Sequence, residues 1–277
     1  MSGRALSLRI SVTDRCGLRC AYCSPGGCEA RSAGGRLLSF EEILRFVRLV
    51  KRGYTVAEAR LTGGEPLLRA GIVTLVEALD AEGVGDLSLT TNGQQLAEFA
   101  APLKAAGLNR LNVSLDSLAP ETFGWLTGGA ELGRTLEGIG AAVRAGLRPV
   151  KLNMVVLKGC NDHEVCDLVR FAIESGCQAR FLELMPIGRA GLSCRDLYVS
   201  SAEVRERLSA EFSITPLPVD PEATSRNYRL RGRRGLTATV GFISPCSEPF
   251  CSMCPRLRLT ADGTLLGCLA RPQGISV

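Results

Sequence analysis

Apolar and polar positions follow two patterns that alternate along the chain. Short apolar stretches bounded by turn residues predict strands over residues 6–14, 59–66, 87–93, 108–116, 148–159 and 179–186. Between them, apolar residues recur every three or four positions, which predicts helices over residues 39–53, 70–83, 95–107, 132–146, 161–176 and 200–212. Six successive strand–helix units predict an α/β protein with a parallel sheet and right-handed crossovers.

Two of these helices carry start signals. Ser39 is placed as an N-cap, Glu42 as its capping-box partner three residues later, and Gly53 as the stop. Asn161 or Asp162 is predicted to open the helix of residues 161–176.

The pattern changes after about residue 212. Short strands are predicted over residues 227–232, 236–243, 257–263 and 264–269, and no long helix follows. Six strand–helix units suit an open partial (β/α)6 barrel better than a closed barrel of eight. We therefore expect a barrel over residues 1–211 and a small β-rich C-terminal subdomain over residues 212–277.

Composition narrows the class of protein. The 277 residues are 45% hydrophobic and 22% charged, an ordinary globular balance. A net charge of +5 is too small to indicate nucleic-acid or membrane binding, but it is compatible with a small anionic substrate if the basic residues converge. The first ten residues lack a long apolar core and no apolar run reaches membrane-spanning length, so we expect a cytoplasmic protein.

Twelve cysteines are the unusual part of the composition. In a chain of cytoplasmic type they indicate metal ligands or small buried residues rather than disulfides. Six of them form two spaced triplets. The other six are interpreted as mostly structural: Cys28, Cys160, Cys166, Cys177, Cys194 and Cys246.

The first triplet is Cys16, Cys20 and Cys23, with the spacing C-x3-C-x2-C directly after the first predicted strand. Three thiolates can hold three corners of a cubane iron–sulfur cluster and leave the fourth iron open to a small molecule, whereas electron-transfer clusters normally use four cysteines. The alternative is a structural zinc site, which needs four Cys or His ligands. The single histidine, His163, is far away in sequence.

Polar motifs follow the predicted strands at the same topological place. They are the cysteine loop, Thr62–Pro66, Thr90–Gly93, Ser114–Asp116, Asn153 and Met185–Pro186. The carboxyl ends of barrel strands form the active face of such folds, so these motifs predict one site. Within it, Gly63 and Gly64 allow the backbone to approach a ligand closely.

The second triplet is Cys251, Cys254 and Cys268, with the spacing C-x2-C-x13-C. Zinc would need a fourth ligand, for which Cys246 is the available residue. A second cubane is favoured, because its open iron can bind a substrate nitrogen or oxygen as a Lewis acid.

Basic residues recur at strand positions near these motifs. The guanidinium group of arginine matches the geometry of phosphate oxygens. Residues two apart in a strand share a face, as Arg256 and Arg258 do. Surface charge or internal salt bridges are the alternative. The set is Arg9, Arg60, Lys151, Arg180, Arg256 and Arg258.

Together these motifs resemble the GTP 3′,8-cyclase family, also called the molybdenum cofactor biosynthesis protein A family, of the radical S-adenosylmethionine (SAM) enzymes. The resemblance spans almost the whole chain. Besides the first triplet with Tyr22, it is carried by RLTGGEPLLR, LTTNG, LNVSLD, VKLNMVVLKGCND, RFLELMPIG and PFCSMCPRLRLTADG. It implies a lyase with a partial (β/α)6 barrel, two [4Fe-4S] clusters and SAM.

Carried over by position, the resemblance implies a role for each motif. The SAM cluster would be held by Cys16, Cys20 and Cys23, and the second cluster by Cys251, Cys254 and Cys268. SAM would contact Tyr22, Gly64, Ser114 and Met185. GTP would contact Arg9, Arg60, Thr91, Lys151, Arg180, Arg256 and Arg258.

The implied reaction begins with one-electron cleavage of SAM to a 5′-deoxyadenosyl radical. That radical takes hydrogen from ribose C3′ of GTP, and the C3′ radical adds to guanine C8. One electron and one proton then give 3′,8-cyclo-7,8-dihydro-GTP for the molybdenum cofactor. The implied partners are an external one-electron donor, a downstream cyclic pyranopterin monophosphate synthase and a second copy in a homodimer, with no nucleic acid or membrane. Two alternatives stay open: a radical SAM enzyme on another substrate such as a peptide, and a non-catalytic iron–sulfur carrier.

Three departures from the family pattern are visible. Gly17 and Ser24 stand where the family commonly has Asn and Met, and the family continues several dozen residues beyond its last cluster cysteine to a Gly-Gly end. This sequence stops at Val277, so we expect a truncated or divergent member that binds SAM and GTP but turns over poorly.

Overall fold

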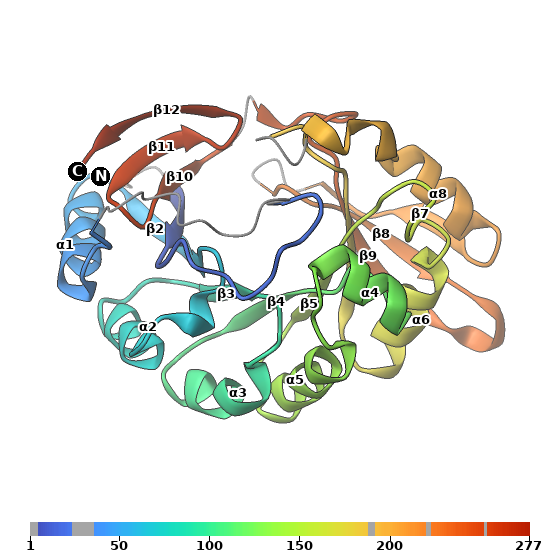
Figure 1. Cartoon of the computed structure of the whole chain (residues 1–277), viewed down its shortest axis with the longest axis horizontal. Helices are drawn as coiled ribbons and strands as arrows, with labels where there is room; N and C mark the ends of the chain where they lie inside the picture. The colour runs from blue at the N-terminus through green and yellow to red at the C-terminus, as the bar shows by residue number, and fades with distance from the viewer. Residues whose placement is uncertain (1–4, 24–35, 188–191, 220–222, 252–253) are drawn as a thin grey trace.

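The computed structural model describes residues 5–23, 36–187, 192–219, 223–251 and 254–277. Ser24 and Cys28 lie outside the described residues. The described strands form one curved sheet of twelve, in the order β12-β11-β10-β1-β2-β3-β4-β5-β6-β9-β8-β7, with helices on its outer side (Figure 1).

The strands are β1 (Ala5–Ser11), β2 (Thr55–Thr62), β3 (Leu87–Thr91), β4 (Arg110–Ser114), β5 (Val150–Val155), β6 (Gln178–Leu182), β7 (Ser213–Pro216), β8 (Arg226–Arg231), β9 (Thr237–Ile243), β10 (Arg256–Leu259), β11 (Thr264–Cys268) and β12 (Arg271–Ser276). The α-helices are α1 (Phe40–Lys51), α2 (Ile72–Ala81), α3 (Leu96–Ala105), α4 (Pro120–Thr127), α5 (Leu132–Arg144), α6 (Val165–Glu174) and α8 (Ser201–Ser209). Short 3-10 helices are η1 (Pro66–Leu68), η2 (Arg195–Leu197) and η3 (Arg233–Gly235).

The six predicted strand–helix units form the parallel sheet, and the open (β/α)6 barrel is confirmed. The C-terminal strands extend it at both edges. Strand β9 pairs parallel to β6 and carries the antiparallel strands β8 and β7, while β10 pairs parallel to β1 and carries β11 and β12. The segment between β9 and β10 therefore crosses from one edge of the open barrel to the other, and it carries Cys246, Cys251 and Cys254.

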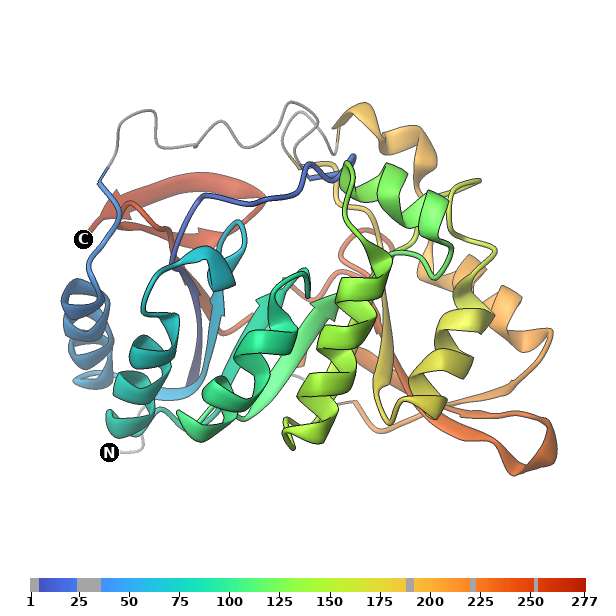
Figure 2. The ribbon, with the colours of Figure 1, turned by 60° about the horizontal axis from the view of Figure 1, so that its bottom comes forward.

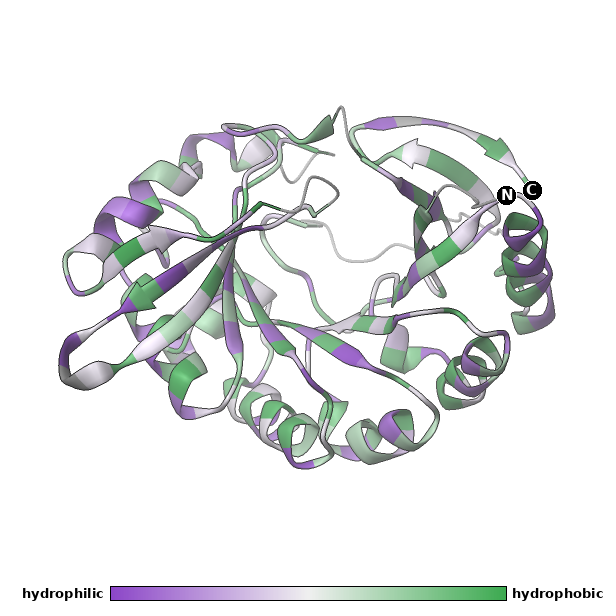
Figure 3. Cartoon of the chain, turned by 180° about the vertical axis from the view of Figure 1, so that it is seen from behind, coloured by the Kyte–Doolittle hydropathy of each residue, from purple (hydrophilic) through white to green (hydrophobic). Residues whose placement is uncertain are grey.

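Side chains alternate along each strand, so one set faces the helices and the other set faces the barrel interior. In β5, Val150, Leu152 and Met154 are buried toward the helices, whereas Lys151 and Asn153 point to the barrel interior and are only partly buried. Figure 3 shows the resulting alternation of hydrophilic and hydrophobic segments along the strands. The apolar core thus lies between sheet and helices, and the polar interior is left for a ligand.

The start signal of α1 is confirmed, and that of α6 is wrong. Ser39 and Glu42 form the predicted capping box at α1. Helix α6 begins at Val165 instead of directly after Asn161 or Asp162. Asn161 is fully buried, and its amide donates to the carbonyls of Asp116 (2.7 Å) and Val155 (2.9 Å), so its side chain is committed to the strand ends.

Among the α-helices and strands that the structure describes, three were not predicted: α4, β7 and β12. Each is short, and β7 and β12 are the two edge strands of the sheet, paired antiparallel with their sequence neighbours β8 and β11. Among the helices that the structure describes, none combines the length and apolar character needed to span a bilayer.

Candidate active site

The first cysteine triplet lies on the loop that leaves the carboxyl end of β1. This loop runs along the upper edge of the barrel toward α4 (Figure 2). Two backbone hydrogen bonds attach it there, from Arg19 N to Thr127 O and from Ala21 N to Leu126 O, both 2.9 Å long. The loop is therefore held by the protein at the end opposite to β1.

Tyr22 anchors the same loop from below. Its hydroxyl donates to Asp116 Oδ2 at 2.6 Å, and Asp116 Oδ1 accepts from Val155 N at 2.8 Å. Burial raises the pKa of Asp116 to about 6, although both hydrogen bonds favour its ionised form. The tyrosine also packs with a small apolar cluster that includes Leu126, so the third cysteine follows a fixed residue.

The glycine pair at the end of β2 packs against the start of the cysteine loop. A Cβ atom at Gly64 would lie 2.1 Å from Arg15 O, and one at Gly63 would lie 2.3 Å from Thr13 O. Gly64 N donates to Thr13 O (2.8 Å) and Glu65 N to Arg15 O (2.7 Å). Only glycine allows this close approach of two backbones.

Ser114 and Met185 lie at this same edge. Ser114 is the last residue of β4, in register with Asn153 of β5, and Met185 follows the end of β6. The four residues predicted to contact SAM therefore share the carboxyl edge of the sheet with the first triplet: Tyr22, Gly64, Ser114 and Met185.

Thr91 is at the same edge but engaged elsewhere. It is buried, its hydroxyl donates to Glu65 Oε1 at 2.7 Å, and it does not line the cavity described below. Its contact with GTP stays a prediction.

The second triplet is assembled by antiparallel pairing. Cys254 precedes β10 and Cys268 ends β11, so the hairpin brings the two positions to the same end. Arg256 Nε donates to Cys254 Sγ at 3.0 Å. Cys251, Cys254 and Cys268 are all exposed.

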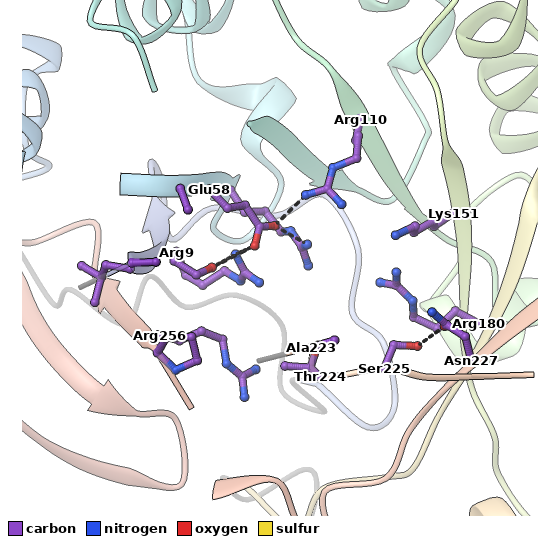
Figure 4. A pocket seen from close by; sticks show the side chains of 16 residues that line it. Arg9, Glu58, Arg110, Lys151, Arg180, Ala223, Thr224, Ser225, Asn227 and Arg256 are labelled. Carbon is purple, nitrogen blue, oxygen red and sulfur yellow. Dashed lines mark hydrogen bonds and ion pairs between the residues drawn. The ribbon is translucent and has the colours of Figure 1, made fainter. Parts of the chain in front are cut away.

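A cavity of about 300 Å³ lies inside the barrel, toward the amino ends of the central strands. Its basic side chains come from six strands and point into one space (Figure 4). They are Arg9, Arg60, Arg110, Lys151, Arg180 and Arg256. Such a concentration of guanidinium groups fits a polyanion such as a triphosphate.

One carboxylate, Glu58, lies among these cations. Its oxygens are 2.7 Å from Arg60 Nη2, 3.2 Å from Arg9 Nη1 and 3.3 Å from Arg110 Nη2. Ser7 Oγ donates to it at 2.9 Å. Burial alone would raise the pKa of Glu58, but the arginines, Arg60 and Arg9 foremost, lower it to about 2.

The basic side chains are strongly perturbed by sharing the cavity. Burial, and next the charge of Arg180, lowers the pKa of Lys151 to about 7. Burial, and next the charge of Arg60, lowers the pKa values of Arg9 and Arg180 to about 10. The cavity is short of negative charge, and this makes it a functional-site candidate.

The structure brings together five of the seven residues predicted to contact GTP: Arg9, Arg60, Lys151, Arg180 and Arg256. Arg258 is two residues from Arg256 on β10, opposite Arg9 in register, but outside the lining. Sequence reasoning missed Ser7, Glu58, Arg110, Ser225 and Asn227. Ser7 and Glu58 stand two positions before Arg9 and Arg60 in their strands, so strand alternation could have found them.

Comparison with known proteins agrees with this arrangement. The radical SAM superfamily profile matches residues 10–172, and the Molybdenum Cofactor Synthesis C profile matches residues 177–277. The GTP 3′,8-cyclase of Petrotoga mobilis is 42% identical over 270 residues, which are 97% of this chain and 82% of that protein. The GTP 3′,8-cyclase of Moorella thermoacetica is 46% identical over 264 residues, 95% of this chain and 80% of that one. This chain belongs to the GTP 3′,8-cyclase family.

Solved structures agree on the fold. Streptococcus suis SuiB bound to the precursor peptide SuiA superposes with a TM-score of 0.72 at 17% identity, over 97% of this chain and 60% of SuiB. HydG, a maturase of the [FeFe]-hydrogenase, gives 0.57 at 14% identity, over 74% of this chain and 48% of HydG. At such identities the likeness shows a radical SAM fold but does not identify the substrate. The substrate is inferred from the residues of the cavity.

Proposed function

We propose that this chain catalyses the radical SAM-dependent cyclisation of GTP to 3′,8-cyclo-7,8-dihydro-GTP, the entry reaction of molybdenum cofactor biosynthesis. The observation that carries the proposal is the cavity lined by six basic side chains inside a barrel whose relatives are GTP 3′,8-cyclases. A triphosphate is the part of GTP that such a cavity would bind.

The proposal gives each motif a role. Cys16, Cys20 and Cys23 hold the SAM cluster, and Cys251, Cys254 and Cys268 hold the second cluster. Tyr22, Gly64, Ser114 and Met185 contact SAM. Arg9, Arg60, Thr91, Lys151, Arg180, Arg256 and Arg258 bind GTP.

The donor set of the first triplet fits an iron–sulfur cluster. Burial raises the pKa of Cys20, and the charges of Asp116, Cys23 and Cys16 raise it further. A thiolate at Cys20 therefore needs a cationic partner, which iron ions provide. Loaded and reduced, the cluster would supply the one-electron cleavage of SAM. The protein's own part is to hold the loop through Tyr22 and Asp116 at the edge above the cation-lined cavity.

The second triplet fits a cluster because of the placement of its thiols. Antiparallel pairing brings Cys254 and Cys268 to the same end of the β10–β11 hairpin, and all three thiols are exposed. Arg256 donates a hydrogen bond to Cys254 and also lines the cavity. A cluster held by Cys251, Cys254 and Cys268 would supply a Lewis acid to the substrate.

The remaining assignments belong to the same proposal. Residues 1–211 are the radical SAM barrel, and residues 212–277 are the auxiliary-cluster subdomain, whose strands extend the barrel sheet at both edges. An external one-electron donor reduces the clusters, a cyclic pyranopterin monophosphate synthase takes the product, and the protein works in the cytoplasm as a homodimer.

The function is tested by anaerobic incubation of the cluster-loaded chain with SAM, a reductant and GTP. Both 5′-deoxyadenosine and cyclised GTP are expected in the same reaction. Formation of 5′-deoxyadenosine without a cyclised nucleotide would point to another substrate, and absence of both would point to an iron–sulfur carrier.

The arginines of β10 are expected to bind phosphate. A hydrogen bond to a charged group is worth about 1.5–3 kcal/mol, so Arg256→Ala and Arg258→Ala should each weaken GTP binding by roughly tenfold or more. Isothermal titration measures this, with iron content checked in parallel because Arg256 also contacts Cys254. Arg48→Ala, which removes an exposed arginine paired with Glu82, is the control. Unchanged affinity in both β10 variants would reject the assignment.

Lys151 is expected to make GTP binding depend on pH. In the empty cavity its pKa is lowered to about 7, so above pH 7 it is neutral and must take up a proton when the triphosphate binds. GTP affinity should therefore fall, by up to about tenfold per pH unit, as pH rises above 7. Lys151→Arg stays charged and should lose this dependence. Titration of GTP itself affects both proteins equally, so parallel pH profiles would contradict the prediction.

A further inference from the structure

Glu58 is the only acidic residue that lines the cavity in the part of the chain that the structure describes. Figure 4 shows it between Arg9 and Arg110, with dashed contacts to its neighbours. One oxygen faces Arg60 and Arg110, and the other faces Arg9 and the hydroxyl of Ser7. Three guanidinium groups and one hydroxyl donor are what a phosphate group would meet at the same place.

The cations around Glu58 have little solvent to screen them. The side chains of Arg9, Arg60 and Arg110, which contact Glu58, are 10%, 18% and 26% exposed, and the six basic groups lie in one small cavity. Buried like charges repel strongly, so the empty cavity needs a counter-anion to keep this arrangement. Glu58 is placed to be that anion, and the arginines keep it ionised.

We propose that Glu58 is a positioning residue that acts as a resident counter-anion: it holds the arginines in the empty cavity and thereby sets how tightly the triphosphate binds. The inference rests on the proposed function and deepens it. Glu58 already neutralises part of the positive charge that a bound triphosphate would neutralise. The carboxylate therefore stabilises the empty protein and lowers its affinity for the anion.

Linkage gives the sign of the effect. Glu58→Gln keeps the shape of the side chain and removes its charge. The empty protein then loses a counter-anion, whereas the filled protein retains one in the triphosphate. Since stability falls more in the empty state than in the filled state, the variant must bind the anion more tightly.

The test uses the cluster-loaded chain under anaerobic conditions, with inorganic tripolyphosphate as the probe. Without the probe, Glu58→Gln is expected to lower the unfolding temperature by several degrees, and saturating tripolyphosphate is expected to close most of that gap. The dissociation constant of tripolyphosphate should fall by roughly fivefold or more. The control is Glu82→Gln, which also breaks a Glu–Arg ion pair, with Arg48 on α1, and should leave the dissociation constant unchanged.

A purely structural role for Glu58 would give a different result. Weaker or unchanged tripolyphosphate binding in Glu58→Gln, or a loss of stability that the probe does not reduce, would overturn the proposal. If the variant folds only when tripolyphosphate is present, the anion from solution has replaced the missing carboxylate, and the proposal is supported. If it does not fold even then, the proposal fails. Tripolyphosphate has no base or ribose, so a failed GTP cyclisation would count against the proposed function and not against this inference.

Discussion

Replacing Cys16, Cys20 and Cys23 together by Ala is expected to abolish both SAM cleavage and GTP cyclisation. These thiols stand on the loop that Tyr22 and Asp116 attach to the strand ends, at the edge of the barrel where the predicted SAM contacts lie. Without them the protein would not hold the cluster that is proposed to deliver an electron to SAM. With about eight irons expected for two cubanes, the variant should keep about half of its iron.

The measurements are iron per chain and 5′-deoxyadenosine formed with a reductant. Cys166→Ala/Cys177→Ala is the matched control, since these two partly buried cysteines lie in α6 and shortly after it, away from the loop. That control should keep its full iron content and its SAM cleavage. Continued formation of 5′-deoxyadenosine by the triple variant would contradict the proposal that the first triplet holds the SAM cluster.

Replacing Cys251, Cys254 and Cys268 together by Ala is expected to separate the two halves of the reaction. SAM cleavage should persist and about half of the iron should remain, because the first cluster is untouched. Cyclised GTP should fall by about a hundredfold or more, since Lewis-acid contact with a substrate is worth several kcal/mol. Arg256 links this triplet to the cavity through its contact with Cys254, so GTP affinity should also weaken.

Metal analysis and product analysis on the same sample decide this second prediction. Loss of all iron would mean that the two triplets serve one cluster. Zinc in place of iron in the unchanged protein would favour the structural zinc site. Undiminished cyclisation would mean that the second cluster does not hold the substrate.

The sequence by itself determined the local features of this protein. Alternation of strand and helix patterns predicted the parallel barrel, because each unit carries its own apolar period and turn residues. Ser39 and Glu42 predicted the start of α1, because a capping box involves only neighbouring residues. The cysteine spacings were equally readable, because they lie within two short segments.

Several basic residues of the cavity could also be predicted from the sequence. Arg9, Arg60, Lys151 and Arg180 stand at strand positions beside recognisable motifs, and the structure brings them to one cavity with Arg256. Thr91 belonged to a motif in the same way, yet the structure uses its hydroxyl to bind Glu65. A motif predicts where a residue lies in its strand, but it does not predict which group its side chain will hydrogen-bond.

Only the tertiary structure decided which distant segments meet. No local pattern places β9 beside β6 and β10 beside β1, because strand pairing depends on burial across the whole sheet. The packing of β1, β2 and β4 around one interior put Glu58 within reach of Arg9 and Arg110, three residues from three strands. The tertiary structure also places the Asn161 side chain against buried carbonyls instead of at a helix cap, because a buried polar group must be hydrogen-bonded wherever the fold places it.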